Sequence, residues 1–148
     1  MATPENLLII VNSATENPYN QYASYVVAFL SKHLAKVKNV TLYYGPNGVK
    51  MAKKGTLAGI PINDEVKNLI AGQLDGLSAS DLPDNLEQFA RFLKDQLGVV
   101  IASCATFNVI DGLAKSLDDT EGLEDFIVPV KLPQAAQALM AADKILYY

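Results

Sequence analysis

The chain contains one cysteine, one histidine and no tryptophan among its 148 residues. A lone cysteine, Cys104, has no partner for a disulfide within the chain, although a disulfide between subunits stays open. Lone thiols persist under reducing conditions, so we expect a cytoplasmic protein. His33, the only histidine, belongs to a segment of helical periodicity far along the chain from Cys104. A cysteine–histidine catalytic pair is therefore not expected, and neither is a metal site of that type.

Long apolar runs are also missing, as are the common nucleotide motifs. The run at 7–11 is far shorter than the roughly 20 residues that span a bilayer. No Lys or Arg precedes it and no small-residue cleavage site follows, so we expect neither a signal peptide nor a membrane partner. No GxGxxG is present, and the GPNG at 45–48 lacks the Lys-Ser/Thr of a P-loop, which favours a plain tight turn. No cofactor is expected.

Basic residues are few and scattered. Lys and Arg number 12 against 16 Asp and Glu, which gives a formal net charge of −4. The basic stripe typical of nucleic-acid binders is absent, so no nucleic-acid partner is expected. One small cluster, formed by Lys50, Lys53 and Lys54, leaves a local anion site open. Because this cluster falls on a short helical turn predicted at 49–54, we expect Lys50 and Lys53 to face solvent; a lysine that instead reached the cleft would add positive charge there.

What the chain has is an alternation of apolar strands and amphipathic helices. Half of its residues are apolar, enough for one core, and its length is typical of a single domain. Short apolar runs predict five strands, at 7–11, 40–44, 99–104, 126–130 and 144–148. Helical spacing predicts the main helices at 18–36, 84–97, 106–117 and 133–142. This order is typical of βαβ units, which place helices on both faces of a mostly parallel sheet.

The local signals for helix ends are clear at two places. Asn17 followed by Pro18 predicts the start of the first helix. Asp84, with Glu87 three residues later, predicts a capping box at the start of another, which Gly98 closes. Between the second strand and this helix, the segment 56–84 is irregular apart from a short amphipathic helix, with Asn63 as its expected cap. The segment is long enough to act as a lid or an assembly surface.

Ligands of open α/β sheets bind outside the carboxyl ends of the strands, where four loops of this chain should meet. Cys104 is the strongest nucleophile among the residues of those loops, and it ends a buried strand just before a helix. Amide groups and a partial positive charge at a helix start favour a thiolate, the reactive form of the side chain. The alternative is a small buried cysteine that only packs. The residues expected to bind a substrate or an anion around Cys104 are Asn12, Ser13, Gly45, Asn47, Gly48 and Thr106.

Three stretches resemble the DsrE/DsrF-like family of sulfur-relay proteins, which includes DsrE and TusD. TLYYGPNGVKMAKKG at 41–55 is similar to their strand, glycine turn and short lysine-bearing helix. LGVVIASCATFNVIDGL at 97–113 is similar to their strand with a cysteine at its end. ADKILYY at 142–148 is similar to their final strand. With the first strand, the resemblance covers most of the chain in order.

The resemblance implies a single DsrE-like domain over 1–148, folded as a flavodoxin-like three-layer α/β/α sandwich with a mostly parallel five-stranded sheet. It implies a homo-oligomer, as a dimer, trimer or hexamer. It also implies that Cys104 carries sulfane sulfur as a persulfide or thiosulfonate, as in a sulfurtransferase. Its partners would be sulfur-donor and sulfur-acceptor proteins or small sulfur species. The longer 56–84 segment departs from the compact family pattern.

Two other functions remain open. Some subunits of the family lack a working cysteine and act only in assembly, so the chain would then be a non-catalytic assembly or small-ligand-binding subunit with a structural cysteine. A flavin-binding electron carrier would follow from fold analogy alone. The loop after the first strand lacks the hydroxyl-rich spacing that would wrap a flavin phosphate. Thiol reactivity at Cys104 separates the first alternative from a sulfur carrier.

Overall fold

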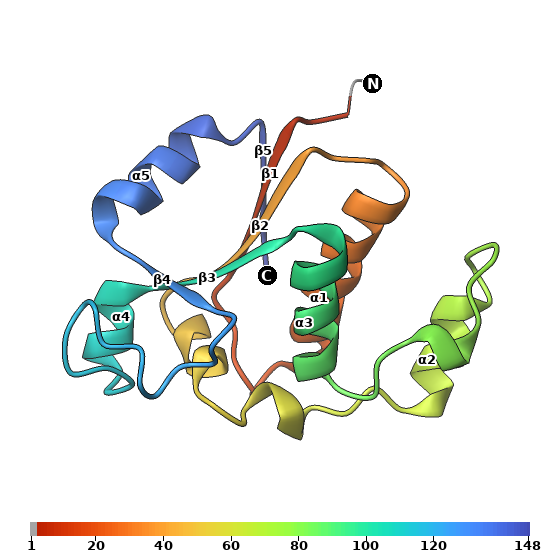
Figure 1. Ribbon diagram of the computed structural model, residues 1–148, viewed down its shortest axis with the longest axis horizontal. Coiled ribbons are helices and arrows are strands. Elements are labelled where there is room, and N and C mark those ends of the chain that lie inside the picture. The colour runs from red at the N-terminus through yellow and green to blue at the C-terminus, as the bar shows by residue number, and fades with distance from the viewer. Residues whose placement is uncertain (1–2) are drawn as a thin grey trace.

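The computed structural model of the chain describes residues 3–148, and its centre is one five-stranded sheet (Figure 1). Its strands are β1 (Asn6–Val11), β2 (Asn39–Tyr44), β3 (Val100–Cys104), β4 (Val128–Val130) and β5 (Lys144–Tyr147). They lie in the order β4-β3-β2-β1-β5. Each of the four pairings is parallel, so the sheet expected to be mostly parallel is parallel throughout. β1 is buried on both faces, which explains its continuous aliphatic sequence.

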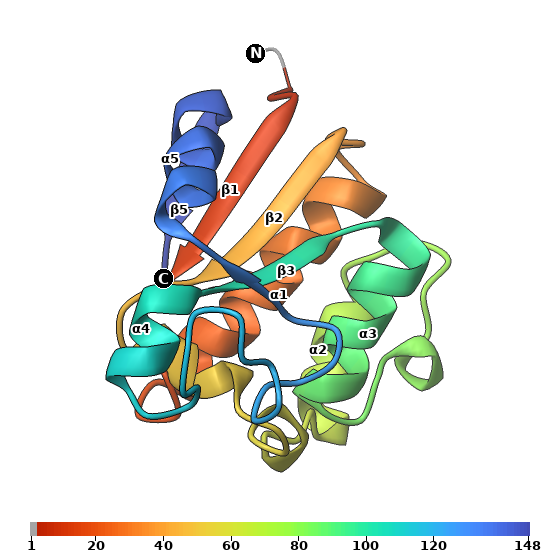
Figure 2. The same ribbon diagram turned by 60° about the vertical axis from the view of Figure 1, so that its left-hand side comes forward.

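Helices cover both faces of this sheet, as predicted. α1 (Pro18–His33) and α3 (Leu86–Leu97) pack on one face, and α5 (Leu132–Ala141) crosses the other (Figures 1 and 2). The chain steps from β1 to β4 in one direction and then returns past β1 to β5. Because such crossovers are right-handed, the return step places α5 opposite α1 and α3. The result is the flavodoxin-like α/β arrangement expected from the sequence.

The helices on the two faces of the sheet bury different amounts of apolar surface. The core lies on the α1 and α3 side, where Ile9, Leu42 and Ile101 of the sheet are fully covered. α5 buries none of its residues completely. Met140 on this helix is 84% exposed, although a helix that covers a sheet normally hides its apolar side chains. The α5 side of the chain therefore keeps a large apolar surface.

Several element boundaries differ from the predicted ones for local reasons. The cap of α3 is Asn85, whose Oδ1 accepts a hydrogen bond from the Gln88 amide at 2.9 Å, whereas the Asp84 carboxylate pairs with Lys67. α4 (Ala105–Ile110) ends well before residue 117 because the chain turns at Gly112, whose φ is +82°. β4 begins only at Val128, since the two residues before it pack into the core as a loop. The predicted caps Asn17 and Asn63 are confirmed.

The segment 56–84 is held at both ends and projects in the middle. It contains α2 (Asp64–Ala71) between two short 3₁₀ turns, Leu57–Gly59 and Ala79–Asp81. Ile60 and Ile62 enter the core, and the Tyr22 hydroxyl donates to the Pro61 carbonyl at 2.6 Å. α2 lies beyond α1 and α3, away from the sheet (Figure 1). Over residues 3–148, none of the helices combines the length and the apolar character needed to cross a bilayer.

Candidate functional site

Cys104 is the last residue of β3 and the N-cap of α4, the position expected from the sequence. The side chains of a strand alternate between its faces. Ser103 pairs with Tyr44, whose hydroxyl lies 2.6 Å from that of Tyr25 on α1, so Ser103 faces the α1 side. Cys104 therefore faces the α5 side. Only 3% of its surface is exposed, which leaves the thiol buried in the single chain.

Tyr43 is the polar neighbour of the thiol. It pairs with Ala102, two residues before Cys104, so its side chain lies on the same face of the sheet. Burial raises the pKa of Tyr43 well above its usual value, and the hydrogen-bonding and charge of the neighbouring Cys104 raise it further. The phenol consequently stays protonated at neutral pH.

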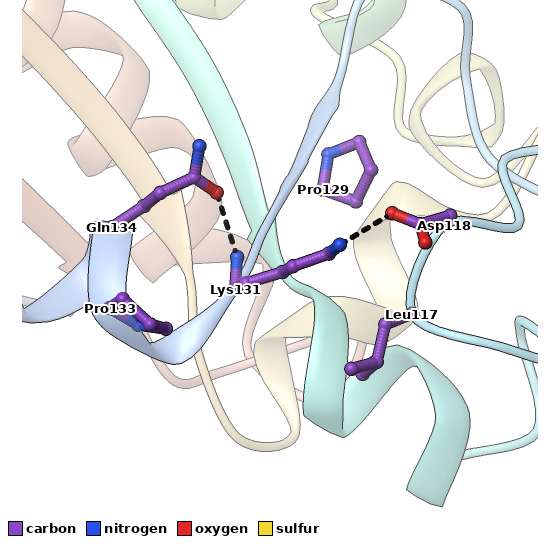
Figure 3. A pocket seen from close by; sticks show the side chains of 6 residues that line it. All are labelled: Leu117, Asp118, Pro129, Lys131, Pro133 and Gln134. Carbon is purple, nitrogen blue, oxygen red and sulfur yellow. Dashed lines mark hydrogen bonds and ion pairs between the residues drawn. The ribbon is translucent and has the colours of Figure 1, made fainter.

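A cavity of about 350 Å³ adjoins the strand next to Cys104. Val130 of β4 is the residue paired with Cys104, and the two residues that flank it, Pro129 and Lys131, line this cavity. Figure 3 shows Lys131 extending toward Asp118, with which it forms an ion pair of 2.8 Å. The Lys131 amide donates to the Gln134 side-chain oxygen at 3.1 Å. Cys104 itself does not line the cavity.

Several donors of the turn after β2 are used within the chain. The Gly45 amide donates to the Val11 carbonyl at 3.0 Å, and the Gly48 amide donates to the Pro46 carbonyl at 2.7 Å. Asn47 donates to the Asn12 carbonyl and to the Glu16 carboxylate. The structure thus brings four of the predicted anion-binding residues together, but it uses the donors of the turn internally.

Glu16 adds a negative charge beside the same turn. Hydrogen bonds from backbone amides, first that of Ala14, lower the pKa of its carboxyl group. Ser13 is nearly buried, and its hydroxyl accepts a hydrogen bond of 3.0 Å from Gln21. Thr106 is half-buried in the first turn of α4. The Ser13 hydroxyl is thus engaged, whereas the Thr106 hydroxyl makes no hydrogen bond to any of residues 3–148.

Close packing explains the two glycines of the turn. A Cβ atom on Gly48 would lie 1.9 Å from the Val11 carbonyl oxygen, and one on Gly45 would lie 2.3 Å from the Asn12 side-chain oxygen. Both contacts are far shorter than atoms tolerate. These glycines let the turn close over the end of β1, which is a structural reason for a feature that the sequence alone associates with a ligand.

Buried polar groups under this edge of the sheet were not predicted. Asn108 of α4 donates to the Ser103 hydroxyl at 3.0 Å, and Gln21 of α1 donates to Ser13. The side-chain oxygens of Gln21 and Asn108 are buried without a hydrogen-bond partner among the described residues. Buried acceptors normally hold a water or another donor. The sequence could have indicated these buried groups, because Gln21 and Asn108 are polar residues on the inward faces of α1 and α4.

A larger cavity, of about 620 Å³, opens at the carboxyl ends of the strands. Lys50 and Lys53 line its mouth, and both are exposed to solvent, as expected. The 3₁₀ helix Gly48–Ala52, which carries Lys50, packs against α4. Its lining residues are Thr15, Lys50, Lys53, Thr56, Asp111, Gly112, Leu113 and Gly122. Within residues 3–148, no group of three His, Cys, Asp or Glu side chains is placed to hold a metal ion.

The parallel sheet, its two helical layers and a nucleophile at a strand end define a flavodoxin-like α/β protein. Among solved structures, the chain resembles the crystal structure of the YchN protein from E. coli, with a TM-score of 0.61 and 18% sequence identity. The match covers 97% of this chain and 99% of YchN, which is a DsrE-family protein. The chain thus has a DsrE-like fold. No protein-family model and no curated protein matches it.

Proposed function

We propose that the chain is a sulfur carrier that holds sulfane sulfur on Cys104 and passes it to a thiol of a partner. The observation that carries this proposal is the position of Cys104 at the end of β3, beside the protonated phenol of Tyr43. The DsrE-like fold and the sequence resemblance to sulfur-relay proteins support it. A thiol at the carboxyl edge of a parallel sheet lies where the substrates of such folds react.

The transfer consists of two attacks on sulfur. The Cys104 thiolate attacks the outer sulfur of a persulfide, a new S–S bond forms, and the donor leaves as a thiolate. With thiosulfate, the sulfane sulfur is attacked and sulfite leaves. An acceptor thiolate then attacks the outer sulfur of the Cys104 persulfide, and Cys104 leaves as a thiolate. The chain has no second cysteine, so the acceptor belongs to another molecule.

Two side chains have roles in this proposal. Tyr43 donates a hydrogen bond to the thiolate or to the persulfide anion, and such bonds to charged acceptors are the strong ones. Lys131 places a positive charge at the cavity beside Val130, where it attracts an anionic donor such as thiosulfate. Its ion pair with Asp118 is exposed and readily exchanged for a bound anion.

The second candidate function is a non-catalytic assembly subunit whose cysteine only packs. The burial of Cys104 favours it, because a thiol with 3% of its surface exposed cannot meet a donor unless neighbouring groups move. The rate of alkylation of Cys104 in the folded protein separates the two functions. A sulfur carrier reacts within minutes, whereas a packed cysteine reacts only when the chain unfolds.

We further propose that the chain forms a homo-oligomer, as a dimer, trimer or hexamer, through the α5 side. Exposed apolar side chains lie on β3, β4 and α5. They are Val100, Val128, Leu132, Leu139 and Met140. A second copy of the chain would bury this surface, and large exposed apolar surfaces commonly mark such contacts.

A further inference from the structure

The cavity of about 620 Å³ lies at the carboxyl ends of three neighbouring strands. Thr15 follows β1, Lys50 and Lys53 follow β2, and the turn at 111–113 follows β3 and α4. This is the edge at which open α/β sheets bind ligands, and the volume falls in the range of small-molecule sites. Cys104 does not line the cavity.

The residues that line the cavity include one more lysine than carboxylates. Lys50 forms an ion pair with Asp111 at 3.1 Å and also donates to the Asn47 side-chain oxygen at 3.0 Å. Lys53 has neither an ion pair nor a side-chain hydrogen bond within the described part of the chain. With two lysines and one aspartate, the lining carries a net charge of +1. A concave surface of one sign concentrates ions of the other sign.

Two neutral hydrogen-bond donors line the same cavity as Lys53. Thr15 and Thr56 line the cavity from two different segments, and their hydroxyl groups make no hydrogen bond to any of residues 3–148. Gly112 and Gly122 also line the cavity.

We propose that this cavity binds a small organic molecule through one terminal oxyanion, held by the Lys53 ammonium and the hydroxyl groups of Thr15 and Thr56. A lysine is a compact point charge with three donors, which suits a phosphate or a carboxylate equally. The volume leaves room for the body of the molecule against Leu113 and the two glycines. Asp111 is the one carboxylate of the lining and works against the anion. This inference does not rest on sulfur transfer.

The test uses isothermal titration calorimetry on the full chain with glycerol 3-phosphate, inorganic phosphate and succinate. Two opposite changes are compared. Lys53→Gln removes the free cation, and Asp111→Asn removes the competing negative charge with almost no change of shape. Lys54→Gln is the matched control, because Lys54 is the adjacent lysine and does not line the cavity. The same titrations on Cys104→Ser show whether binding is independent of the thiol.

We expect at least one organic anion to bind, with Lys53→Gln weakening it about tenfold or more, since hydrogen bonds to charged groups are the strong ones. Asp111→Asn should tighten binding several-fold, and Lys54→Gln should leave it within about twofold because exposed charges act weakly. Preference for glycerol 3-phosphate over succinate would assign the phosphate class, and the reverse the carboxylate class. Failure of all three probes to bind at millimolar concentration would overturn the proposal. Equal weakening by Lys53→Gln and Lys54→Gln would also overturn it.

Discussion

Tyr43 of β2 and Cys104 of β3 lie on the same face of the sheet, because Tyr43 pairs with Ala102, two residues before the cysteine. The pairing brings a phenol and a thiol together at the edge where ligands of this fold bind. Tyr43 is half-buried, and Cys104 is almost fully covered. Together they form a donor and a nucleophile, the minimum that a persulfide carrier needs.

Tyr43→Phe should slow the reaction of Cys104 with a disulfide reagent by about tenfold at neutral pH, because the thiolate loses a charge-assisted hydrogen bond. The measurement is the pseudo-first-order rate of thiol modification in the folded protein. Tyr147→Phe is the control, since Tyr147 is 66% exposed on β5 and lies two strands from β2. A Tyr43→Phe variant that reacts as fast as the wild type would remove Tyr43 from the site.

Gly48→Ala should destabilise the fold by about 1–3 kcal/mol or more, since a Cβ there would lie 1.9 Å from the Val11 carbonyl oxygen and the backbone must shift. Gly59→Ala tests the same change where no atom lies within 4 Å of the added Cβ. Urea unfolding followed by circular dichroism measures both. The prediction fails if Gly48→Ala is as stable as Gly59→Ala, because the glycine would then have no packing role.

Glu124 should make the stability of the fold depend on pH. Burial raises the pKa of its carboxyl group above the ordinary value of 4.5, and a hydrogen bond with the neighbouring Glu87 carboxyl raises it further. A group with a raised native pKa contributes stability that is complete below pH 4.5 and is lost as pH rises through the native pKa. Arg91 faces the same group and partly offsets the shift.

Glu124→Gln should therefore unfold at a higher urea concentration than the wild type at pH 7.5, with the difference vanishing near pH 4.5, where the wild-type carboxyl is protonated. The glutamine oxygen can still accept the hydrogen bond from the Gly55 amide. Glu121→Gln is the control, because that side chain is exposed. Equal stability of Glu124→Gln and the wild type at pH 7.5 would show that burial of the ionised Glu124 carboxylate does not destabilise the fold.

The α5 side should be the contact between subunits. Light scattering coupled to size exclusion should give two, three or six times the 16.0 kDa chain mass for the wild type. The double variant Val128→Lys and Met140→Lys should give the mass of one chain, since burying unpaired charges in an apolar contact is costly. Tyr19→Lys changes an equally exposed side chain on α1 and should keep the wild-type mass. A wild-type protein of one chain mass would contradict this contact.

Most of the fold could be predicted from the sequence because strands that are buried on both faces leave a strong local signal. The run at 7–11 and the cap Asn17 are examples, and both appear in the structure close to their predicted bounds. The predicted helix ends were wrong where contacts between distant segments determine the structure. Asp84 fits a capping pattern, but Lys67, far along the chain, draws its carboxylate away.

The site was less predictable than the fold. The strand-end position of Cys104 follows from local pattern, but its burial depends on how α4 and β4 pack around it. The sequence favours a tight turn at 45–48 that also carries candidate anion-binding residues, and the three-dimensional contacts with Val11 show why Gly48 is needed. Lys53 is exposed, as expected, but its place on the wall of the larger cavity could not be predicted because that wall is formed by segments far apart in the sequence.

The most direct measurement is intact-mass spectrometry of the reduced protein after incubation with a low-molecular-weight persulfide and, separately, with thiosulfate or tetrathionate. A sulfur carrier should gain a sulfur-sized or thiosulfonate-sized adduct that a thiol releases, and Cys104→Ser should gain none. The donor that works would define the sulfur source. A folded wild-type protein that stays unmodified and also resists alkylation at Cys104 would contradict sulfur transfer and leave the assembly subunit as the function.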